Sequence, residues 1–167
     1  GYTVIKSEYK GIGHEVTYFV PREDDCEVWQ LRLMNKSGRA RRFSVIPYSE
    51  FTFWSEPESR NIQWSLHLTR CDYKDGLILY NFIEPHPAFD MKANRNYVGD
   101  RPGFAFMGMN KKAADYDCSR DAFIGMYHSE TDPAGLRNKR LSCSIIRGGV
   151  ACAALRAEIS VEDGAGE

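Results

Sequence analysis

The segment Ile12-Gly-His-Glu-Val-Thr-Tyr-Phe-Val20 carries the pattern on which the interpretation of the fold depends. Its even positions are apolar apart from a histidine, whereas Glu15 and Thr17 fall on the other face. Alternation with a period of two is typical of a β-strand with one buried face and one face in water. Residues 27–33 alternate in the same way, with Trp29 and two leucines opposite polar side chains. Both segments are therefore predicted to be half-buried strands.

A third alternating segment lies near the end of the sequence, at residues 153–161. Its odd positions carry alanine, leucine, isoleucine and valine, and Arg156, Glu158 and Ser160 lie between them. The pattern predicts a strand whose odd positions are buried and whose three polar side chains face water.

Further strands are expected at residues 2–9, 42–54, 65–70, 77–82, 104–109 and 141–146. The turns expected between strands are Lys10-Gly11, Asn35-Lys-Ser-Gly38, Asp75-Gly76 and Gly148-Gly149, all of which contain residues that tolerate positive φ. Only residues 119–127 look helical, with Asp117 or Ser119 available as the N-cap. Many short strands joined by turns predict an all-β protein, an antiparallel β-sandwich with one short helix, in a single domain spanning residues 1–167.

Composition narrows the range of functions. The 167 residues contain 22 basic and 23 acidic side chains, so the formal net charge is −1. So small an excess provides no electrostatic reason to bind nucleic acid or an anionic membrane. No apolar run approaches the 18 or so residues of a membrane span. We expect neither a nucleic acid nor a membrane as a partner.

The cysteines indicate the compartment. The sequence contains five, at positions 26, 71, 118, 143 and 152. An odd number without any C-x-x-C spacing argues against a disulfide framework and against a zinc site. The first residues lack the basic start and apolar core of a secretion signal. We therefore expect a reduced, cytoplasmic protein in which most thiols are structural.

Candidate catalytic residues are few. The four histidines, at positions 14, 67, 86 and 128, have no metal-ligand spacing, and none is assigned a catalytic role. Asp121 fits the first turn of the expected helix, where the helix dipole favours a carboxylate. Glycoside hydrolases use a pair of carboxylic acids. If the chain were an independent glycoside hydrolase, Asp117 and Glu50 would be the candidate pair.

One segment, residues 84–103, interrupts the alternation with three prolines and the run Asn94-Arg-Asn-Tyr97. Loops of this length in a compact domain are usually either functional or disordered. Arg95, Asn96, Tyr97 and Arg101 are the candidate residues for contact with a sugar or a protein partner, because guanidinium, amide and aromatic groups suit both. The alternative is a surface loop held in place by Phe89 and the prolines.

Several segments together resemble a known family. They are Tyr2-Thr-Val-Ile-Lys-Ser-Glu-Tyr-Lys-Gly-Ile12, Glu15-Val-Thr-Tyr-Phe-Val-Pro21, Glu27-Val-Trp-Gln-Leu-Arg-Leu-Met-Asn-Lys-Ser37, Arg42-Phe-Ser-Val45, Tyr48-Ser-Glu-Phe51, Asp121-Ala-Phe-Ile-Gly125 with Tyr127, and Ala154-Leu-Arg-Ala-Glu-Ile159. In this order and spacing they resemble the N-terminal β-sandwich of the glycoside phosphorylases of glycoside hydrolase family 94. The family includes cellobiose, cellodextrin and chitobiose phosphorylases.

The resemblance implies a supersandwich that precedes a helical linker and an (α/α)6 catalytic barrel. Such enzymes cleave β-linked gluco-oligosaccharides with inorganic phosphate, which is the co-substrate, to a sugar 1-phosphate with inversion. The proton-donating acid lies in the barrel, so the resemblance implies no catalytic residue in this chain, no metal and no organic cofactor. It also implies a homodimer, in which the chain contacts its own barrel and a second subunit. The chain is accordingly expected to be a truncated domain, part of a larger phosphorylase.

The function expected from these observations is that of a noncatalytic carbohydrate-binding-like or scaffold domain of an inverting glycoside phosphorylase. On this interpretation the chain alone has no enzymatic activity and the parent protein has it. Two alternatives stay open. One is an independent hydrolase that uses Asp117 and Glu50, and the other is a protein-interaction module without sugar affinity.

Overall fold

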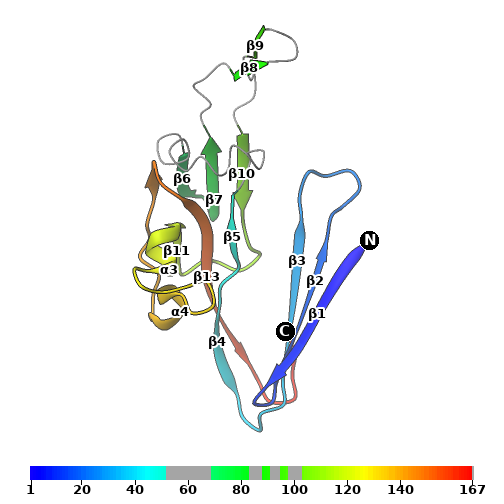
Figure 1. The fold of residues 1–167 in the computed structure, drawn as a ribbon. Coiled ribbons are helices and arrows are strands. Elements are labelled where there is room, and N and C mark those ends of the chain that lie inside the picture. Colours follow the sequence, from blue (N-terminus) through cyan, green and yellow to red (C-terminus); the bar gives the residue numbers. More distant parts are fainter. Residues whose placement is uncertain (52–68, 83–87, 91–94, 98–102, 167) are drawn as a thin grey trace. The chain divides into compact units, whose positions relative to one another are not determined.

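A computed structural model describes residues 1–51, 69–82, 88–90, 95–97 and 103–166. Antiparallel strands dominate these residues, and two short helices accompany them (Figure 1). The all-β antiparallel fold predicted from the alternation is confirmed. None of the helices in these ranges has the length and apolarity needed to cross a membrane.

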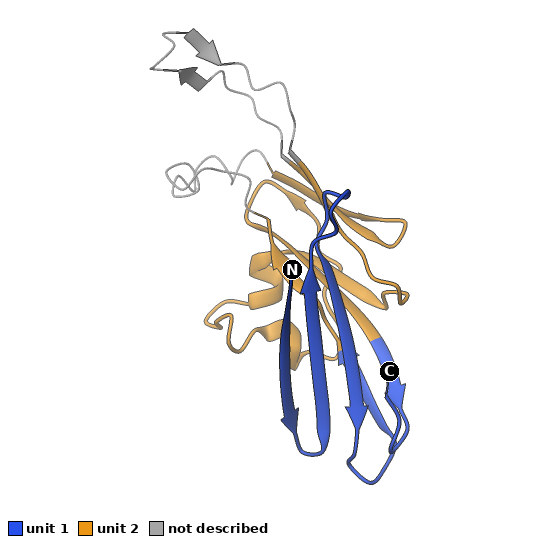
Figure 2. Cartoon of the chain, turned by 90° about the vertical axis from the view of Figure 1, so that its right-hand side faces the viewer, with its two compact units in different colours: residues 1–44, 158–167 blue, residues 45–157 orange. Residues whose placement is uncertain are grey.

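The chain forms two compact units, which are described separately (Figure 2). Unit 1 comprises residues 1–44 and 158–167, and unit 2 comprises residues 45–157. The long strand β13 (Ala151–Val161) runs from unit 2 into unit 1.

Unit 1 contains the antiparallel sheet β1-β2-β3. Its strands are β1 (Tyr2–Tyr9), β2 (Ile12–Phe19) and β3 (Val28–Asn35). The β1–β2 hairpin closes through Lys10 and Gly11, at φ 51° and 76°. Two consecutive positive φ angles produce the turn whose twist matches that of the flanking strands. The turn predicted at Lys10-Gly11 is confirmed.

Asn35 anchors the turn that leads from β3 to β4 (Arg41–Val45). Its Oδ1 accepts hydrogen bonds from the Ser37 backbone N–H at 3.1 Å and from the Ser37 hydroxyl at 2.8 Å. Its Nδ2 donates to the carbonyls of Arg39 at 2.8 Å and Val161 at 2.9 Å. The side chain is almost completely buried, and these bonds join the turn to the end of β13.

Unit 2 contains a second sheet in the order β10-β7-β6-β12. Its strands are β6 (Thr69–Lys74), β7 (Leu77–Phe82), β10 (Gly103–Met107) and β12 (Ile146–Arg147). The β6–β7 hairpin turns at Asp75 and Gly76, at φ 53° and 87°, as the sequence predicts.

The other layer of unit 2 is built on the first part of β13, which pairs with β11 (Asp115–Ser119) and β5 (Tyr48–Glu50). Its odd positions pack into a core with the inner side chains of the β6–β7 hairpin, namely Ala151, Ala153 and Leu155 with Cys71, Ile78 and Tyr80. Its even positions pack into a second core, namely Cys152 and Ala154 with Phe123, Ile124 and Leu141. This part of β13 therefore lies between two cores.

The wet face expected for residues 153–161 is wrong up to residue 157, since residues 151–157 are all buried, but it is right at Glu158 and Ser160, which are exposed. Alanines occupy four of these seven positions, and short side chains let layers approach on both sides. Arg156, expected in water, is buried as well. Glu158 is the first exposed residue of the strand.

The predicted helix is present as α3 (Arg120–Ile124) with Ser119 as its N-cap, but it ends three residues before the expected end at residue 127, because Gly125 caps it at φ 85°. The Ser119 hydroxyl accepts a hydrogen bond from the backbone N–H of Ala122 at 3.3 Å. A second helix, α4 (Ala134–Arg137), was not expected, because a single turn carries no periodicity.

The expected strand at residues 42–54 is broken into β4 and β5 by Ile46-Pro47, and its last residues, 52–54, lie outside the described ranges. The strand expected at 141–146 is wrong except at its last residue, where β12 begins. Ser142 and Ser144 direct their backbone N–H groups to the carboxylate of Asp117, and Cys143 has φ 56°. The segment also exchanges backbone hydrogen bonds with β11, from Cys143 to Tyr116 at 2.8 Å and from Cys118 to Ser144 at 3.1 Å, but it forms only an isolated bridge and no strand.

Candidate functional site

The four residues predicted to contact a sugar or partner fall in the long proline-containing segment. Arg95, Asn96 and Tyr97 form strand β9 (Arg95–Tyr97), which pairs with β8 (Ala88–Asp90) as an antiparallel ladder. Their side chains and the whole of Arg101 lie outside the described residues. The predicted contact therefore stays a prediction.

Asp117, one of the two candidate hydrolase acids, is 1% exposed. Its Oδ1 accepts hydrogen bonds from the backbone N–H groups of Ser142 and Ser144, both at 3.1 Å, and from both hydroxyls. The Ser144 hydroxyl in turn accepts from the Cys118 and Ser119 backbone N–H groups, at 3.2 Å and 3.1 Å. The carboxylate fastens the 141–144 loop onto β11 through its Oδ1, while its Oδ2 lies 3.3 Å from the Ser142 backbone nitrogen.

Asp115 lies two residues earlier on the same face of β11, directly opposite Arg156 of β13. The Arg156 guanidinium donates from Nε to Oδ1 at 2.7 Å and from a terminal nitrogen to Oδ2 at 2.5 Å. The Leu141 backbone N–H adds a bond at 3.2 Å. Burial by itself raises the pKa of Asp115, but these hydrogen bonds outweigh it and hold the pKa below its usual range.

Glu50, the other candidate acid, lies at the end of β5 in a partly exposed network. It accepts from the Tyr48 hydroxyl at 2.6 Å and from Arg120 Nε at 2.8 Å. Arg120 also donates to Glu130 at 2.6 Å. Burial and the bond to Glu50 raise the pKa of Tyr48, and the bonds to Glu130 and Glu50 raise the pKa of Arg120. The network ties β5 to the start of α3.

Two of the histidines are described. His14 is half-buried in β2, and His128 places Nδ1 3.0 Å from the Asp132 carbonyl oxygen. His67 and His86 lie outside the described residues. In the part of the chain that the structure describes, no three histidine, cysteine or acidic residues come together as a metal site would require.

The cysteines are all free thiols. Cys71, Cys118 and Cys152 are buried in the two cores of unit 2, Cys26 is half-buried and Cys143 is exposed. The hydrogen bond to Cys118 and burial raise the pKa of Cys71, and burial raises the pKa of Cys152. The prediction that most thiols are structural agrees with three of the five.

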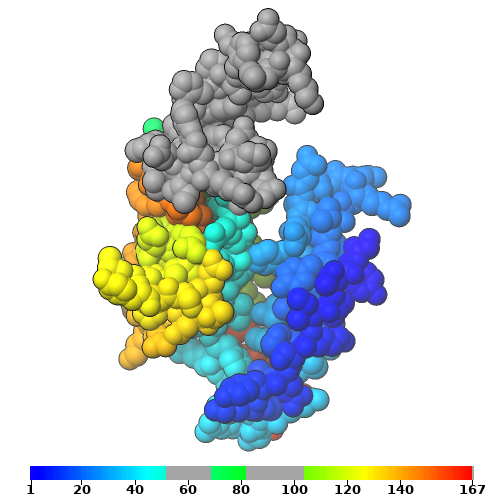
Figure 3. All heavy atoms as spheres, viewed as in Figure 1, coloured from blue at the N-terminus to red at the C-terminus, as the bar shows by residue number. Residues whose placement is uncertain are grey.

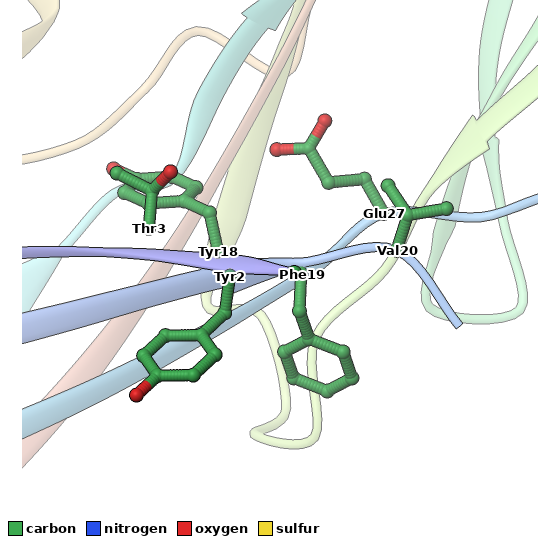
Figure 4. A pocket seen from close by; sticks show the side chains of 7 residues that line it. Tyr2, Thr3, Tyr18, Phe19, Val20 and Glu27 are labelled. Carbon is green, nitrogen blue, oxygen red and sulfur yellow. The ribbon is translucent and has the colours of Figure 1, made fainter. Parts of the chain in front are cut away.

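Unit 1 carries a shallow hollow of about 480 Å³ at the end of its sheet. Figure 4 shows Tyr2 and Phe19, which are register partners, on one side of the strands and Thr3 and Tyr18 on the other. Glu27 lines the same hollow and accepts a bond from the Trp29 indole at 2.6 Å. We assign it no chemistry, because it is open and its charged group already has a donor.

Unit 2 carries a second hollow, of about 570 Å³, on the outer face of the β10-β7-β6 sheet. Phe104 and Phe106 line it with 66% and 62% of their surfaces exposed, and Asn81 lies beside them. Reasoning from the sequence missed this surface. The signal was present, because residues 77–82 and 104–107 place apolar side chains on both faces of their strands.

A third exposed surface lies around the α3–α4 connection, whose atoms are yellow at the surface in Figure 3. Met126, Tyr127 and Leu136 expose most of their apolar area there. Tyr127 has φ 66°, a left-handed conformation that is uncommon for an aromatic residue.

Taken together, the fold is a layered antiparallel β domain in which the candidate acids Asp117 and Glu50, and Asp115 beside them, are bonded to the domain's own strands and loops. Within that class, the chain belongs to the glycosyl hydrolase 94 supersandwich domain family, which matches residues 1–167. The resemblance found in the sequence is confirmed.

Curated relatives of the chain are phosphorylases. An N,N'-diacetylchitobiose phosphorylase of Vibrio furnissii is 31% identical over 164 residues, which cover 98% of this chain and 19% of that protein. A second N,N'-diacetylchitobiose phosphorylase, of Vibrio proteolyticus, is 29% identical over 98% of this chain and 19% of its own length. A solabiose phosphorylase of Paenibacillus borealis is 30% identical over 89% of this chain and 16% of its own length. The chain thus spans about a fifth of the length of such relatives and corresponds to a domain found in glycosyl hydrolase 94 phosphorylases.

Proposed function

We propose that the chain is a noncatalytic carbohydrate-binding-like or scaffold domain of an inverting glycoside phosphorylase. The parent reaction would be phosphorolysis of β-linked gluco-oligosaccharides to a sugar 1-phosphate, with inorganic phosphate as co-substrate and without a metal or organic cofactor. The relatives named above support the reaction class, since each is a phosphorylase.

The observation that carries the noncatalytic assignment is the way Asp117 and Glu50 are bonded. A general acid must reach the glycosidic oxygen and change its protonation state during the reaction. Asp117 is buried beneath the 141–144 loop and accepts from both serines, and Glu50 accepts from Tyr48 and Arg120. Both carboxylates stabilise the fold, which disfavours the independent hydrolase.

A turnover assay tests this assignment. The 167-residue chain is incubated with cello-oligosaccharides and phosphate, and released sugar and consumed phosphate are measured. No turnover is expected, and turnover that disappears in D117N or E50Q would establish the hydrolase instead. Calorimetric titration of the same oligosaccharides then separates a binding domain, which releases heat, from a pure scaffold or interaction module, which does not.

The proposal extends to assembly. In the parent enzyme, which we place in the cytoplasm as a homodimer, Arg95, Asn96, Tyr97 and Arg101 would contact the second subunit or the oligosaccharide. Their composition supports this, because planar guanidinium and aromatic groups bind both proteins and sugars. Alanine replacements at these four positions in the complete enzyme are expected to weaken dimerisation or to raise KM for the oligosaccharide. Unchanged values of both would contradict the contact.

A further inference from the structure

The β10-β7-β6-β12 sheet carries apolar side chains on both faces, and the described chain covers only one of these faces. Cys71, Ile78 and Tyr80 point inward and are at most 2% exposed. The neighbouring positions on β7 and β10 point outward, and there Leu79, Phe104 and Phe106 remain exposed. Large exposed aromatic side chains on a rigid sheet commonly mark a binding surface.

The strand register brings these outer side chains together. Phe104 lies opposite Asn81, and Phe106 lies opposite Leu79. One strand further, Asp72 lies opposite Leu79. Residues on one face of a strand are about 7 Å apart, so the two phenyl rings form a short row along β10. We call the hollow lined by Asp72, Leu79, Asn81, Phe104, Phe106 and Arg147 the outer platform.

Asn81 gives the outer platform a polar group that lacks a hydrogen-bond donor among the described residues. Its Oδ1 is buried and accepts no hydrogen bond from any residue in the described ranges. Buried acceptors are nearly always satisfied, and one left without a donor destabilises the folded state. A ligand hydroxyl beside Phe104 would supply the donor once the Asn81 side chain turns its Oδ1 from this buried position toward the platform.

The charges on the platform are already balanced where they meet. A terminal nitrogen of Arg147 lies 2.6 Å from Asp72 Oδ1, so neither side chain presents an uncompensated charge. Arg70 and Lys74 lie on the same face of β6 and can donate to uncharged oxygens. A neutral ligand with many hydroxyl groups fits this arrangement better than a free anion or cation.

We infer that the outer platform is a saccharide-binding site, on which two consecutive sugar units of a neutral β-linked oligosaccharide stack on Phe104 and Phe106 and one hydroxyl donates to Asn81 Oδ1. The apolar C–H face of a pyranose packs on an aromatic ring, while its rim of hydroxyls reaches amide, carboxylate and guanidinium groups. This inference rests on the carbohydrate-binding part of the proposed function and assigns it to named residues.

The experiment uses the 167-residue chain and two probes, cellotetraose and tetra-N-acetylchitotetraose, titrated by calorimetry. F104A and F106A are expected to lower the affinity about tenfold each, because each removes one stacking surface. L77A is the control. Leu77 is an exposed apolar residue of the same sheet face that does not line the hollow, so the L77A variant should bind both probes with the wild-type affinity.

Asn81→Leu distinguishes binding from folding. It removes the unpartnered acceptor and keeps a similar volume, so the melting temperature should rise while the affinity for both probes falls. A variant that lowered both together would indicate a purely structural side chain and would contradict the role of Asn81.

The remaining outcomes separate the inference from the proposed function. Wild-type binding that F104A and F106A leave unchanged would overturn the outer platform while carbohydrate binding by the domain stands. No wild-type binding of either probe would overturn the outer platform together with the carbohydrate-binding part of the proposed function, and would leave the scaffold role. Self-association that F104A or F106A abolishes, without saccharide binding, would identify the platform as a protein interface instead.

Discussion

Arg156 of β13 and Asp115 of β11 stand directly opposite each other and form a two-point ion pair in the interior of unit 2. The two side chains are only 6% and 7% exposed. A pair removed from water this completely contributes to stability only as long as both partners are present.

Removing one partner of this pair is therefore expected to destabilise the domain strongly. R156M leaves the Asp115 carboxylate buried without its counter-ion and should lower the free energy of unfolding by about 3–5 kcal/mol in urea titrations. The double variant D115L/R156M removes both charges and should recover most of that loss. A single variant as stable as the wild type would contradict the buried pair.

The same pair predicts a dependence of stability on pH. Hydrogen bonds hold the pKa of Asp115 below its unfolded value, so the folded state keeps the carboxylate ionised where the unfolded chain binds a proton. The stabilisation is complete above the unfolded pKa of about 4 and is lost as the pH falls through the folded pKa. Urea midpoints should therefore drop below about pH 4, and less steeply in D115N. D132N is the control and should show the same pH dependence as the wild type. The bond to Arg137 also lowers the pKa of Asp132, but that ion pair is exposed to water, and exposed ion pairs contribute little to stability.

Asp117 is expected to matter for folding rather than for chemistry. D117A leaves the backbone N–H groups and hydroxyls of Ser142 and Ser144 without their acceptor and should cost about 3 kcal/mol, measured by urea unfolding. D117N keeps an oxygen at the Oδ1 position and should cost about 1 kcal/mol. Equal losses from the two variants would show that the charge, and not the hydrogen-bonding oxygen, holds the loop.

Tyr127 is expected to stabilise nothing in the isolated chain. Its φ of 66° disfavours an L-residue with a large side chain by about 1–2 kcal/mol, and the residue is 98% exposed. Y127N, which tolerates that conformation, should raise the free energy of unfolding by about 1 kcal/mol, whereas Y127F should leave it unchanged. A loss of stability in Y127N would mean that the ring makes stabilising contacts.

The thiols should divide into two groups on labelling with an aromatic disulfide reagent under native conditions. Cys143 is exposed and Cys26 is half-buried, so two thiols should react promptly. Burial raises the pKa of Cys152, and the bond to Cys118 and burial raise that of Cys71, so the three buried thiols should react only on unfolding. C26S and C143S should each lower the number of quickly reacting thiols by one. A third quickly reacting thiol would contradict the burial of the three cysteines in the cores of unit 2.

The positions of many strands and turns in the sequence were predictable, because the signals for them are local. Residues 2–9 and 77–82 form the strands expected of them, and the turns at Lys10-Gly11 and Asp75-Gly76 have the positive φ angles that glycine and its neighbour allow. The serine N-cap of α3 was also visible, since a cap interacts only three residues along the chain. Strand β11 was not predicted, because two aspartates interrupt its apolar pattern.

The candidate site was predictable only in part. The strand that contains Phe104 and Phe106 was predicted from the sequence. The exposure of the two rings was not, because it depends on which face of the β10-β7-β6 sheet the layer built on β13 covers. The roles of the acids were equally hidden, because Asp117 meets Ser142 and Ser144 across 25 and 27 residues of sequence.

The amino-acid sequence by itself determined the alternating strands, their tight turns and the family, since each depends on neighbours within a few residues or on the order of segments. Only the tertiary structure decided that β13 is buried on both faces, that Arg156 neutralises Asp115 and that two phenylalanines remain in water. The physical reason is that burial and charge pairing depend on which distant segment packs against a side chain, and a strand's own pattern does not specify that neighbour.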